Sequence, residues 1–450
     1  MPRRTTSRPL TREVLALALP AFVALVAEPL FLLADAAVVG HLGTTELAGL
    51  GIASVVLRAA VGSCVFLAYA TTAAVARQVG AGDTAAALSQ GVAGLWLAVG
   101  VGAVGTVVGL GASSVLVAAF DPDPGVADAA ATYLGISWLG LIPALVLLAA
   151  TGVLRGFADT RTPLLVAVVG NLANIALNVL LVYGVGLGIA GSAIGTVVAQ
   201  AGSAAALAAV VVRRARRVGV PLRPDTSGVR RAARSGGPLV VRTLSLQAGL
   251  VAMTWGTSQL GATAVATHQL AMSVWTFLAF ALDAVAIAAQ TLTGTALGAG
   301  DVGRTRATTD WLVRVGLVSG VVTGILLALT APLLGPLFTD DPTVVDRLTV
   351  VLVVAALFQP LAGVVFVLDG VLIGAGDGRW LAVAGTVVTA LFVPALVVAV
   401  RALADRSGGG PATGTAWLWA VFGLVFMGGR GLALVLRARG ASWMVTGAVR

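Results

Sequence analysis

The stretch that decides the fold is VLALALPAFVALVAEPLFLLADAAVV, residues 14–39. It is long enough to cross a bilayer, which takes about 20 apolar residues, yet it contains Pro20, Glu28, Pro29 and Asp35. Proline removes a backbone donor from a helix, so we expect the helix to bend at Pro20 and Pro29. A carboxyl group inside a span is costly and usually faces a cavity, an ion path or a partner. The stretch therefore predicts a bent membrane span that carries a titratable group.

The composition places the rest of the chain in a membrane as well. Of its 450 residues, 58% are hydrophobic and 10% are charged, whereas a soluble domain has about 25% charged residues. We therefore expect an all-α integral membrane protein. The apolar runs predict twelve transmembrane helices, at residues 14–39, 47–76, 87–118, 126–153, 163–184, 190–212, 238–257, 264–296, 308–336, 343–372, 380–400 and 416–436.

The two halves of the chain repeat at a constant offset of 218 residues. Pro20 matches Pro238, the run GAGD at 80–83 recurs at 298–301, and GVL at 152–154 recurs at 370–372. Each half holds six predicted helices, an even number, so both halves enter the membrane from the same side. We expect two six-helix bundles, residues 1–212 and 238–450, related by a pseudo-two-fold axis along the membrane normal. A basic cytoplasmic connector, residues 213–237, joins them.

The net charge of +9 carries topological information. Arginines occupy the N-terminus, the connector and one set of loops, while the opposite loops hold most of the acids. Because basic loops stay in the cytoplasm, we expect a multi-pass protein of the cytoplasmic membrane with both termini inside. Arg401 and Arg406 fall on the predicted outside, against this rule. Placed in this way, the charge does not indicate a nucleic-acid partner.

Asp35 is the strongest candidate for function. Its repeat partner is Met253, so the carboxyl group is not part of the duplicated scaffold. We hypothesise that Asp35 binds the coupling cation, a proton or Na⁺; the alternative is a carboxyl group that only hydrogen-bonds a neighbouring helix. Asn171, Asn174 and Asn178 are spaced to share one helix face. They either line the cavity near Asp35 or hydrogen-bond between helices.

Three other intramembrane acids are candidate cavity residues: Glu28, Asp283 and Asp369. Each either lines a substrate cavity or cation site, or is paired for structural reasons. The GAGD runs at 80–83 and 298–301 lack the lysine of a phosphate-binding loop, and we interpret them as tight turns. The sequence shows no metal-ligand cluster, catalytic nucleophile or nucleotide motif. It therefore predicts no enzyme, no metal and no cofactor, and an ion gradient as the energy source.

Three motifs resemble the multidrug and toxic compound extrusion (MATE) family, in particular its branch similar to DNA-damage-inducible protein F (DinF-like). They are DAAVVGHLG at residues 35–43, FLAFALDA at 277–284 and LDGVLIG at 368–374. The resemblance covers nearly the whole chain. It implies a pair of six-helix bundles that export organic cations in exchange for protons or sodium. It also implies that Asp35 is the coupling carboxylate, that its helix bends at Pro20, and that the amides of the fifth helix line the N-terminal cavity.

The chain departs from the family pattern at one position. Members often have an acid where Asn178 stands, which argues against a two-carboxylate sodium site in the first half and favours protons. We therefore expect a monomeric secondary antiporter for small, lipophilic organic cations. The alternative is a lipid-linked precursor flippase of the same superfamily. A flippase should have a cationic cavity, whereas we expect the intramembrane charge here to be mainly acidic.

Overall fold

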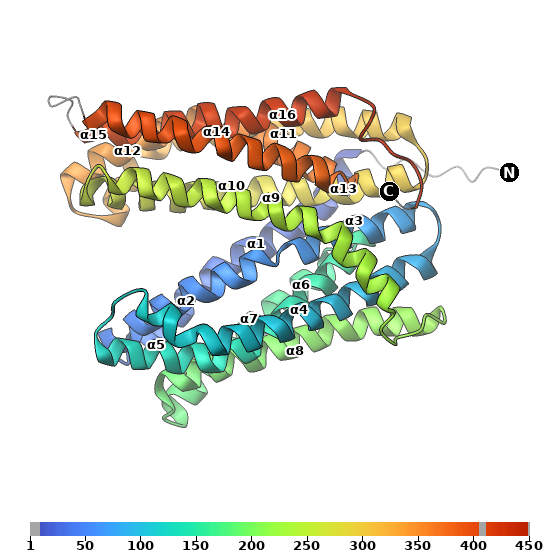
Figure 1. Ribbon diagram of the computed structural model, residues 1–450, viewed down its shortest axis with the longest axis horizontal. Coiled ribbons are helices and arrows are strands. Elements are labelled where there is room, and N and C mark those ends of the chain that lie inside the picture. Colours follow the sequence, from blue (N-terminus) through green and yellow to red (C-terminus); the bar gives the residue numbers. More distant parts are fainter. Residues whose placement is uncertain (1–9, 405–410, 449–450) are drawn as a thin grey trace. The chain divides into compact units, whose positions relative to one another are not determined.

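The computed structural model describes residues 10–404 and 411–448, and every regular element within them is a helix. The chain divides into two compact units. The N-terminal unit contains residues 16–237 and the C-terminal unit contains residues 238–446; the first residues of α1, up to Leu15, group with the C-terminal unit. Figure 1 labels the helices.

The N-terminal unit is built mainly from the first eight α-helices (Figure 1), and it also includes the start of α9, up to Gly237. A short 3₁₀ turn, η1, links α5 to α6, and a π-helical segment, η2, extends α7. The bounds are α1 (Leu10–Gly40), α2 (Thr44–Ser63), α3 (Phe66–Gly80), α4 (Thr84–Ala118), α5 (Pro124–Ser137), η1 (Trp138–Gly140), α6 (Leu141–Gly156), α7 (Arg161–Val179), η2 (Leu180–Gly184) and α8 (Gly188–Arg217).

The C-terminal unit follows the same order of elements. A second π-helical segment, η3, lies within its last long helix. The bounds are α9 (Thr226–Ser258), α10 (Ala262–Gly298), α11 (Val302–Phe338), α12 (Pro342–Leu357), α13 (Gln359–Gly374), α14 (Gly378–Ala404), α15 (Pro411–Val421), η3 (Phe422–Met427) and α16 (Gly428–Arg439).

The helices are long and apolar enough for a multi-pass membrane protein. The described residues form ten candidate spans, or eleven if α12 and α13, which meet at a bend of 51°, count as one. The remaining expected span, 238–257, lies in α9, whose second half contains Arg242 and Gln247 and is therefore less apolar. The predicted all-helical membrane fold is confirmed.

The repeated GAGD runs form the same turn in both units, as expected. Gly82 and Gly300 have φ angles of +81° and +75°, a left-handed conformation that favours glycine. The carboxylates of Asp83 and Asp301 cap the next helix, and each accepts a hydrogen bond from the backbone N–H three residues ahead at 2.8 Å. The duplicated sequence therefore encodes the same tight, capped turn between two helices in each unit.

The repeated GVL runs mark close contacts between helices. A Cβ atom on Gly152 of α6 would lie 2.6 Å from the carbonyl oxygen of Ala68 on α3. In the other unit, a Cβ atom on Gly370 of α13 would collide with the backbone of Ala286 on α10, the repeat partner of Ala68. Small residues at such positions let two backbones approach inside a membrane. The 218-residue repeat is therefore also a repeat of helix packing.

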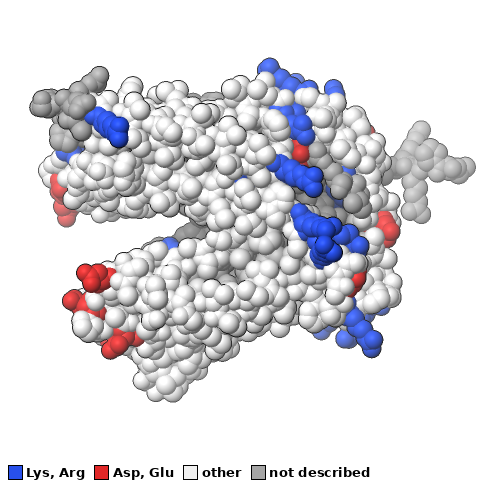
Figure 2. Space-filling view, in the orientation of Figure 1, with Lys and Arg blue, Asp and Glu red and all other residues white. Residues whose placement is uncertain are grey.

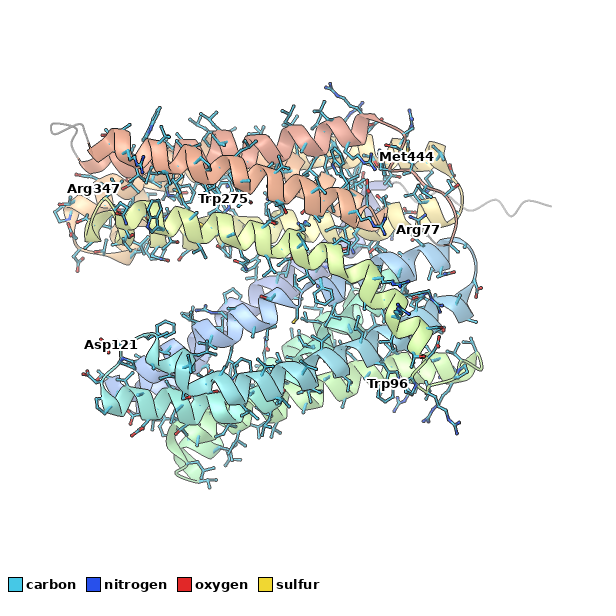
Figure 3. The ribbon with its side chains drawn as sticks, in the orientation of Figure 1. Arg77, Trp96, Asp121, Trp275, Arg347 and Met444 are labelled. Carbon is cyan, nitrogen blue, oxygen red and sulfur yellow. The ribbon has the colours of Figure 1, made fainter. Side chains whose placement is uncertain are left out.

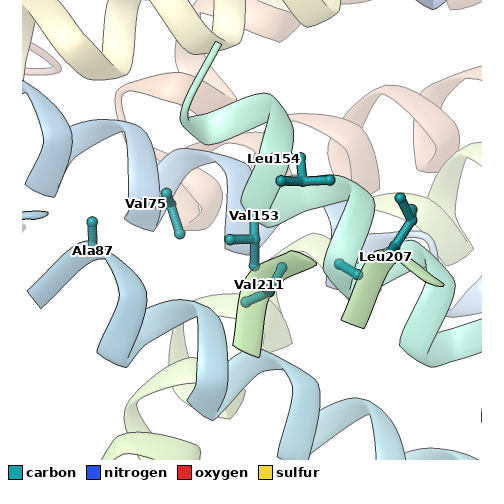
Figure 4. Packing of buried hydrophobic residues seen from close by; sticks show 7 residues of the cluster. Val75, Ala87, Val153, Leu154, Leu207 and Val211 are labelled. Carbon is teal, nitrogen blue, oxygen red and sulfur yellow. The ribbon is translucent and has the colours of Figure 1, made fainter. Parts of the chain in front are cut away.

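The core of the N-terminal unit forms beside this contact. Figure 4 shows its packed side chains, which come from α3, α4, α6 and α8. They are almost completely buried: Val75, Ala87, Ala150, Val153, Leu154, Leu207 and Val211. Both α3 and α8 pack against α6, so this cluster holds α8, one of the helices of the candidate site, within the N-terminal unit.

The predicted basic connector is mostly helical. Only residues 218–225 lie between α8 and α9, and they pack on the N-terminal unit: Val220 is buried and the Trp96 indole N–H donates to the Leu222 carbonyl at 2.9 Å. Asp225 directly precedes α9, and hydrogen bonds from Ser227 hold the pKa of its carboxyl group below the ordinary value.

Opposite charges lie at opposite ends of the N-terminal unit. Asp121 lies at one end, and Arg77 and Trp96 at the other (Figure 3). Figure 2 shows acidic side chains gathered at the first end and arginines at the second. This separation agrees with the loop charges that predicted the orientation.

Candidate functional site

Four helices of the N-terminal unit converge on the carboxyl group of Asp35. Asp35 lies near the end of α1 and is only 6% exposed. Its Oδ1 accepts hydrogen bonds from the Asn178 amide of α7 at 2.6 Å and from the Ser192 hydroxyl of α8 at 2.8 Å. The Tyr133 hydroxyl of α5 donates to Oδ2 at 3.3 Å. Asp35 is thus a buried carboxylate that is held entirely by neutral donors.

The glycines of α8 bring these donors close to Asp35. Gly191 and Gly195 flank Ser192 on the face of α8 that packs on α7 and η2. A Cβ atom on Gly191 would lie 2.8 Å from the Leu181 carbonyl group, and one on Gly195 would collide with the Asn178 side chain. The π-helical segment η2 begins two residues after Asn178, and such segments often occur at functional sites.

The donors suit either protonation state of Asp35. While the carboxylate is charged, all three side chains donate to it. Once it is protonated, its own O–H needs an acceptor, and the hydroxyls of Ser192 and Tyr133 can reverse their roles, whereas an amide N–H cannot. The amide oxygens of Asn174 and Asn178 are buried without a hydrogen-bond partner in the described structure. The site can therefore take up and release a proton without losing its hydrogen bonds.

The predicted amide stripe on α7 divides into two parts. Asn174 and Asn178 are buried, and Asn174 donates to the Thr196 hydroxyl of α8 at 2.9 Å. Asn171 is only half-buried, and it is not among the described hydrogen-bond donors to Asp35. The first of these amides thus lies outside the hydrogen-bond network, and Asn178 contacts Asp35 directly.

The first proline of α1 leaves a backbone carbonyl without its helical donor, and a side chain from the turn before α7 donates to it instead. Both Pro20 and Pro29 lie inside α1, which remains one helix from Leu10 to Gly40. A proline at position 20 cannot donate to the carbonyl of Ala16, four residues earlier. The Thr160 hydroxyl donates to that carbonyl at 3.4 Å, from the turn before α7. The side chain of Glu28, another predicted cavity residue, lies outside the described residues.

Among the described residues, the C-terminal unit does not repeat this site. At the offset of 218, apolar and fully buried side chains replace its members: Met253 for Asp35, Val351 for Tyr133 and Leu396 for Asn178. Nearby, α10, α14, α15 and η3 pack an aromatic cluster: His268, Trp275, Phe392, Trp419, Phe422 and Phe426. Figure 3 labels Trp275 within this unit. At these three positions the duplicated scaffold therefore carries polar side chains in the N-terminal unit and apolar ones in the C-terminal unit.

The two acids predicted for the C-terminal half differ in their surroundings. Asp369 on α13 is buried and forms ion pairs with two arginines, Arg242 of α9 and Arg430 of α16. Asp283 on α10 is half-buried and does not line the pocket beside Asp369. The expectation of mainly acidic intramembrane charge was wrong here, because two guanidinium groups surround a single carboxylate.

Sequence reasoning identified Asp35 and Asn178 but missed Tyr133 and Ser192. Tyr133 is one of only three tyrosines in the chain, and Ser192 stands in a glycine-rich face, so both carried a weak signal. Within the described residues, no group of three or more His, Cys, Asp or Glu side chains could hold a metal ion. The described Asp35 site thus consists of one carboxylate surrounded by hydroxyl and amide groups.

Comparisons with known proteins agree with this architecture. The MatE family model matches residues 20–180 and 238–398. The chain is 32% identical to Protein DETOXIFICATION 44, chloroplastic, of Arabidopsis thaliana, over 90% of this chain and 78% of that protein. It is 30% identical to DNA damage-inducible protein F of Escherichia coli, over 63% of each chain.

The fold matches solved structures as well. A crystal structure of MATE in complex with MaD3S superposes with a TM-score of 0.84 at 22% identity, over 97% of both chains. The family match covers both halves of the repeat, and it includes the helices that carry Asp35 and Asn178. The chain therefore belongs to the MatE family and is a multi-pass membrane transporter of the multidrug and toxin efflux type, not an enzyme.

Proposed function

We propose that this transporter exports small, lipophilic organic cations in exchange for protons, and that Asp35 is the coupling group. The observation that carries the proposal is the buried Asp35 carboxylate with its three neutral donors. No described arginine or histidine pairs with it, so its charge is available to a cation. Its counterpart in the other unit is Met253, so only the N-terminal unit offers this charge.

The exchange follows from competition for one negative charge. When the site opens to the outside, Asp35 takes up a proton and loses its attraction for a cationic substrate, which leaves. When the site opens to the cytoplasm, Asp35 loses the proton and the substrate binds again. Protonation of Asp35 must also change the conformation of the protein, and we propose that α1 bends. Its backbone hydrogen bonding is interrupted at Pro20, and Pro29 lies between Pro20 and Asp35.

Two features favour the proton over Na⁺ as the coupling ion. The described site has one carboxylate, because position 178 holds an asparagine, where the resemblance to the MATE family implies an acid. Its hydroxyl donors, Ser192 and Tyr133, can also act as acceptors once Asp35 is protonated. The amide oxygens of Asn174 and Asn178 leave Na⁺ as the alternative, since Na⁺ would need several oxygen ligands.

We further propose that the protein acts as a monomer in the cytoplasmic membrane, with both termini inside. The arginines at one end of the N-terminal unit support this orientation (Figure 2). We propose that residues 1–212 and 238–450 work as two six-helix lobes joined at 213–237. The match to DNA damage-inducible protein F supports a place in the DinF-like branch.

A lipid-linked precursor flippase is the second candidate. It is favoured by one observation, the pair of buried guanidinium groups of Arg242 and Arg430. A flippase would move a pyrophosphate-linked lipid, and the negative charge of the pyrophosphate would be attracted to these arginines and repelled by the Asp35 carboxylate.

Transport in proteoliposomes tests the first candidate. A fluorescent lipophilic cation is followed first under a pH gradient and then under a Na⁺ gradient at constant pH. We expect dye movement with the pH gradient alone. Movement with the Na⁺ gradient alone would identify Na⁺ as the coupling ion and refute proton exchange. If neither gradient moves the dye through folded protein, organic-cation exchange is refuted and the flippase assay, with a labelled lipid pyrophosphate, follows.

A further inference from the structure

A second contact ties the end of α1 to the π-helical segment η2. Tyr183 lies in η2, and its hydroxyl group donates to the backbone carbonyl oxygen of Val38 on α1. Less than one helical turn earlier on α1, Asp35 accepts the hydrogen bond from the Asn178 amide at 2.6 Å. Asn178 lies at the end of α7, directly before η2. The last part of α1 is therefore held at two neighbouring points by one continuous helical element, α7 followed by η2.

The Val38 carbonyl is a group that α1 cannot satisfy by itself. The last four carbonyls of a helix lack an intrahelical donor, and Val38 is one of these in α1, which ends at Gly40. The Leu42 N–H lies four residues after Val38, but it donates to Val39 at 2.9 Å. The Tyr183 hydroxyl supplies a donor in its place. The end of α1 is thus completed by a side chain from a distant part of the sequence.

The π-helical turn accounts for the position of Tyr183. In a regular α-helix, side chains three or four residues apart share a face, and side chains five apart do not. In η2 the Val185 N–H donates to the Leu180 carbonyl, five residues earlier, at 2.9 Å. Such a turn takes up one extra residue. Tyr183, five residues after Asn178, is therefore turned back toward the face of Asn178, and both side chains reach α1.

The segment η2 gives Tyr183 a firm support within the N-terminal unit. Val182, its neighbour, is only 2% exposed. A Cβ atom on Gly191 of α8 would lie 2.8 Å from the Leu181 carbonyl group, so α8 packs closely on this segment. Tyr183 itself is 48% exposed. Its hydroxyl contact with α1, rather than burial of its ring, is therefore the feature that requires a tyrosine.

We propose that Tyr183 is a positioning residue for exchange: its hydroxyl group holds the end of α1 on η2 and thereby keeps Asp35 against Asn178. The inference rests on the proposed role of Asp35 as the coupling group. Tyr183 acts through the Val38 carbonyl and is not among the described donors to Asp35. Arg401 stands at its repeat position, so this tyrosine, like Asp35, is not part of the duplicated scaffold.

Hydrogen exchange tests the contact without any transport measurement. Tyr183→Phe removes only the hydroxyl group, and Tyr69→Phe on α3 removes a hydroxyl group elsewhere in the same unit as the matched control. Backbone exchange of peptides that cover residues 36–43 is followed by mass spectrometry in detergent. We expect exchange there to become about two- to tenfold faster in Tyr183→Phe, from the loss of one hydrogen bond. We expect no change there in Tyr69→Phe. Unchanged exchange in Tyr183→Phe overturns the proposal.

A double-mutant cycle tests whether the contact acts through Asn178. Initial rates of substrate-coupled proton movement are measured in proteoliposomes for Tyr183→Phe, Asn178→Ala and the double variant. We expect Tyr183→Phe to slow exchange about two- to tenfold in the wild-type background and less than twofold in Asn178→Ala. Equal slowing in both backgrounds overturns the positioning role, because a general loss of stability would act in either. If Asn178→Ala has no measurable exchange, Asn178→Ser replaces it.

The outcomes separate this inference from the proposed function. If the wild-type protein couples proton and substrate movement and Tyr183→Phe does so at the same rate, only the role of Tyr183 is refuted. Tyr183 would then be one more aromatic side chain at the membrane interface. If the wild-type protein does not couple the two movements, the proposed function fails, and the positioning role of Tyr183 fails with it. Faster hydrogen exchange in Tyr183→Phe would then show a structural contact alone.

Discussion

The contact between α3 and α6 gives a prediction whose size follows from the structure. A Cβ atom on Gly152 would lie 2.6 Å from the carbonyl oxygen of Ala68 and 3.1 Å from its Cα. An ordinary contact begins near 3.4 Å, so the two backbones must separate by about 0.8 Å in Gly152→Ala. Overpacking of this kind costs about 1–3 kcal/mol.

The matched control is Gly100→Ala on α4, where nothing lies within 4 Å of the added methyl group. Both variants gain the same helix propensity, about 1 kcal/mol, so their difference isolates the collision. We expect Gly152→Ala to be less stable than Gly100→Ala by about 1–3 kcal/mol. Gly370→Ala, its repeat partner, should show a similar loss because its Cβ meets the backbone of Ala286.

Equilibrium unfolding in mixed micelles, with increasing sodium dodecyl sulfate, measures these differences. Equal stability of Gly152→Ala and Gly100→Ala would refute the packing argument. A loss in Gly152→Ala without a loss in Gly370→Ala would refute the claim that the repeat preserves helix contacts.

Three further predictions concern the site and the turns. Ser192→Ala should slow exchange about tenfold or more, since a lost hydrogen bond to a charged group costs about 1.5–3 kcal/mol; initial transport rates measure this, and an unchanged rate would contradict the role of the hydroxyl. Asn178→Asp places a second carboxyl group against Asp35, so transport should become responsive to Na⁺ gradients; a variant that still ignores Na⁺ would show that the carboxylate count does not select the ion. Asp83→Ala and Asp301→Ala should each lower the free energy of unfolding by about 1 kcal/mol through loss of a helix cap, and no change in either would exclude a stabilising cap at that turn.

Much of the fold could be predicted because it depends on local chemistry and on duplication. Apolar run lengths predicted the helices, and the repeat predicted equivalent turns at Asp83 and Asp301. The helical spacing of Asn174 and Asn178 placed them on one face, and both are buried. The membrane span in α9 was harder to recognise from hydropathy, because Arg242 lies within the apolar run.

The contacts of the site could not be predicted, because spacing along one helix does not show which helices face one another. Tyr133 and Ser192 lie 98 and 157 residues from Asp35 in the sequence. The partners of Asp369 were missed for the same reason: Arg242 is 127 residues away, and it looks like one more basic residue after the connector.

The most direct test of Asp35 compares wild-type protein, Asp35→Asn and Asp128→Asn in proteoliposomes. Asp128 is an exposed acid on α5 of the same unit and serves as the matched control. A pH-sensitive dye and a labelled organic cation report proton and substrate movement together. We predict that wild type and Asp128→Asn couple the two fluxes in opposite directions, and that Asp35→Asn abolishes both proton movement and uphill export. Coupled exchange by folded Asp35→Asn at the wild-type rate would contradict the central role of this carboxylate.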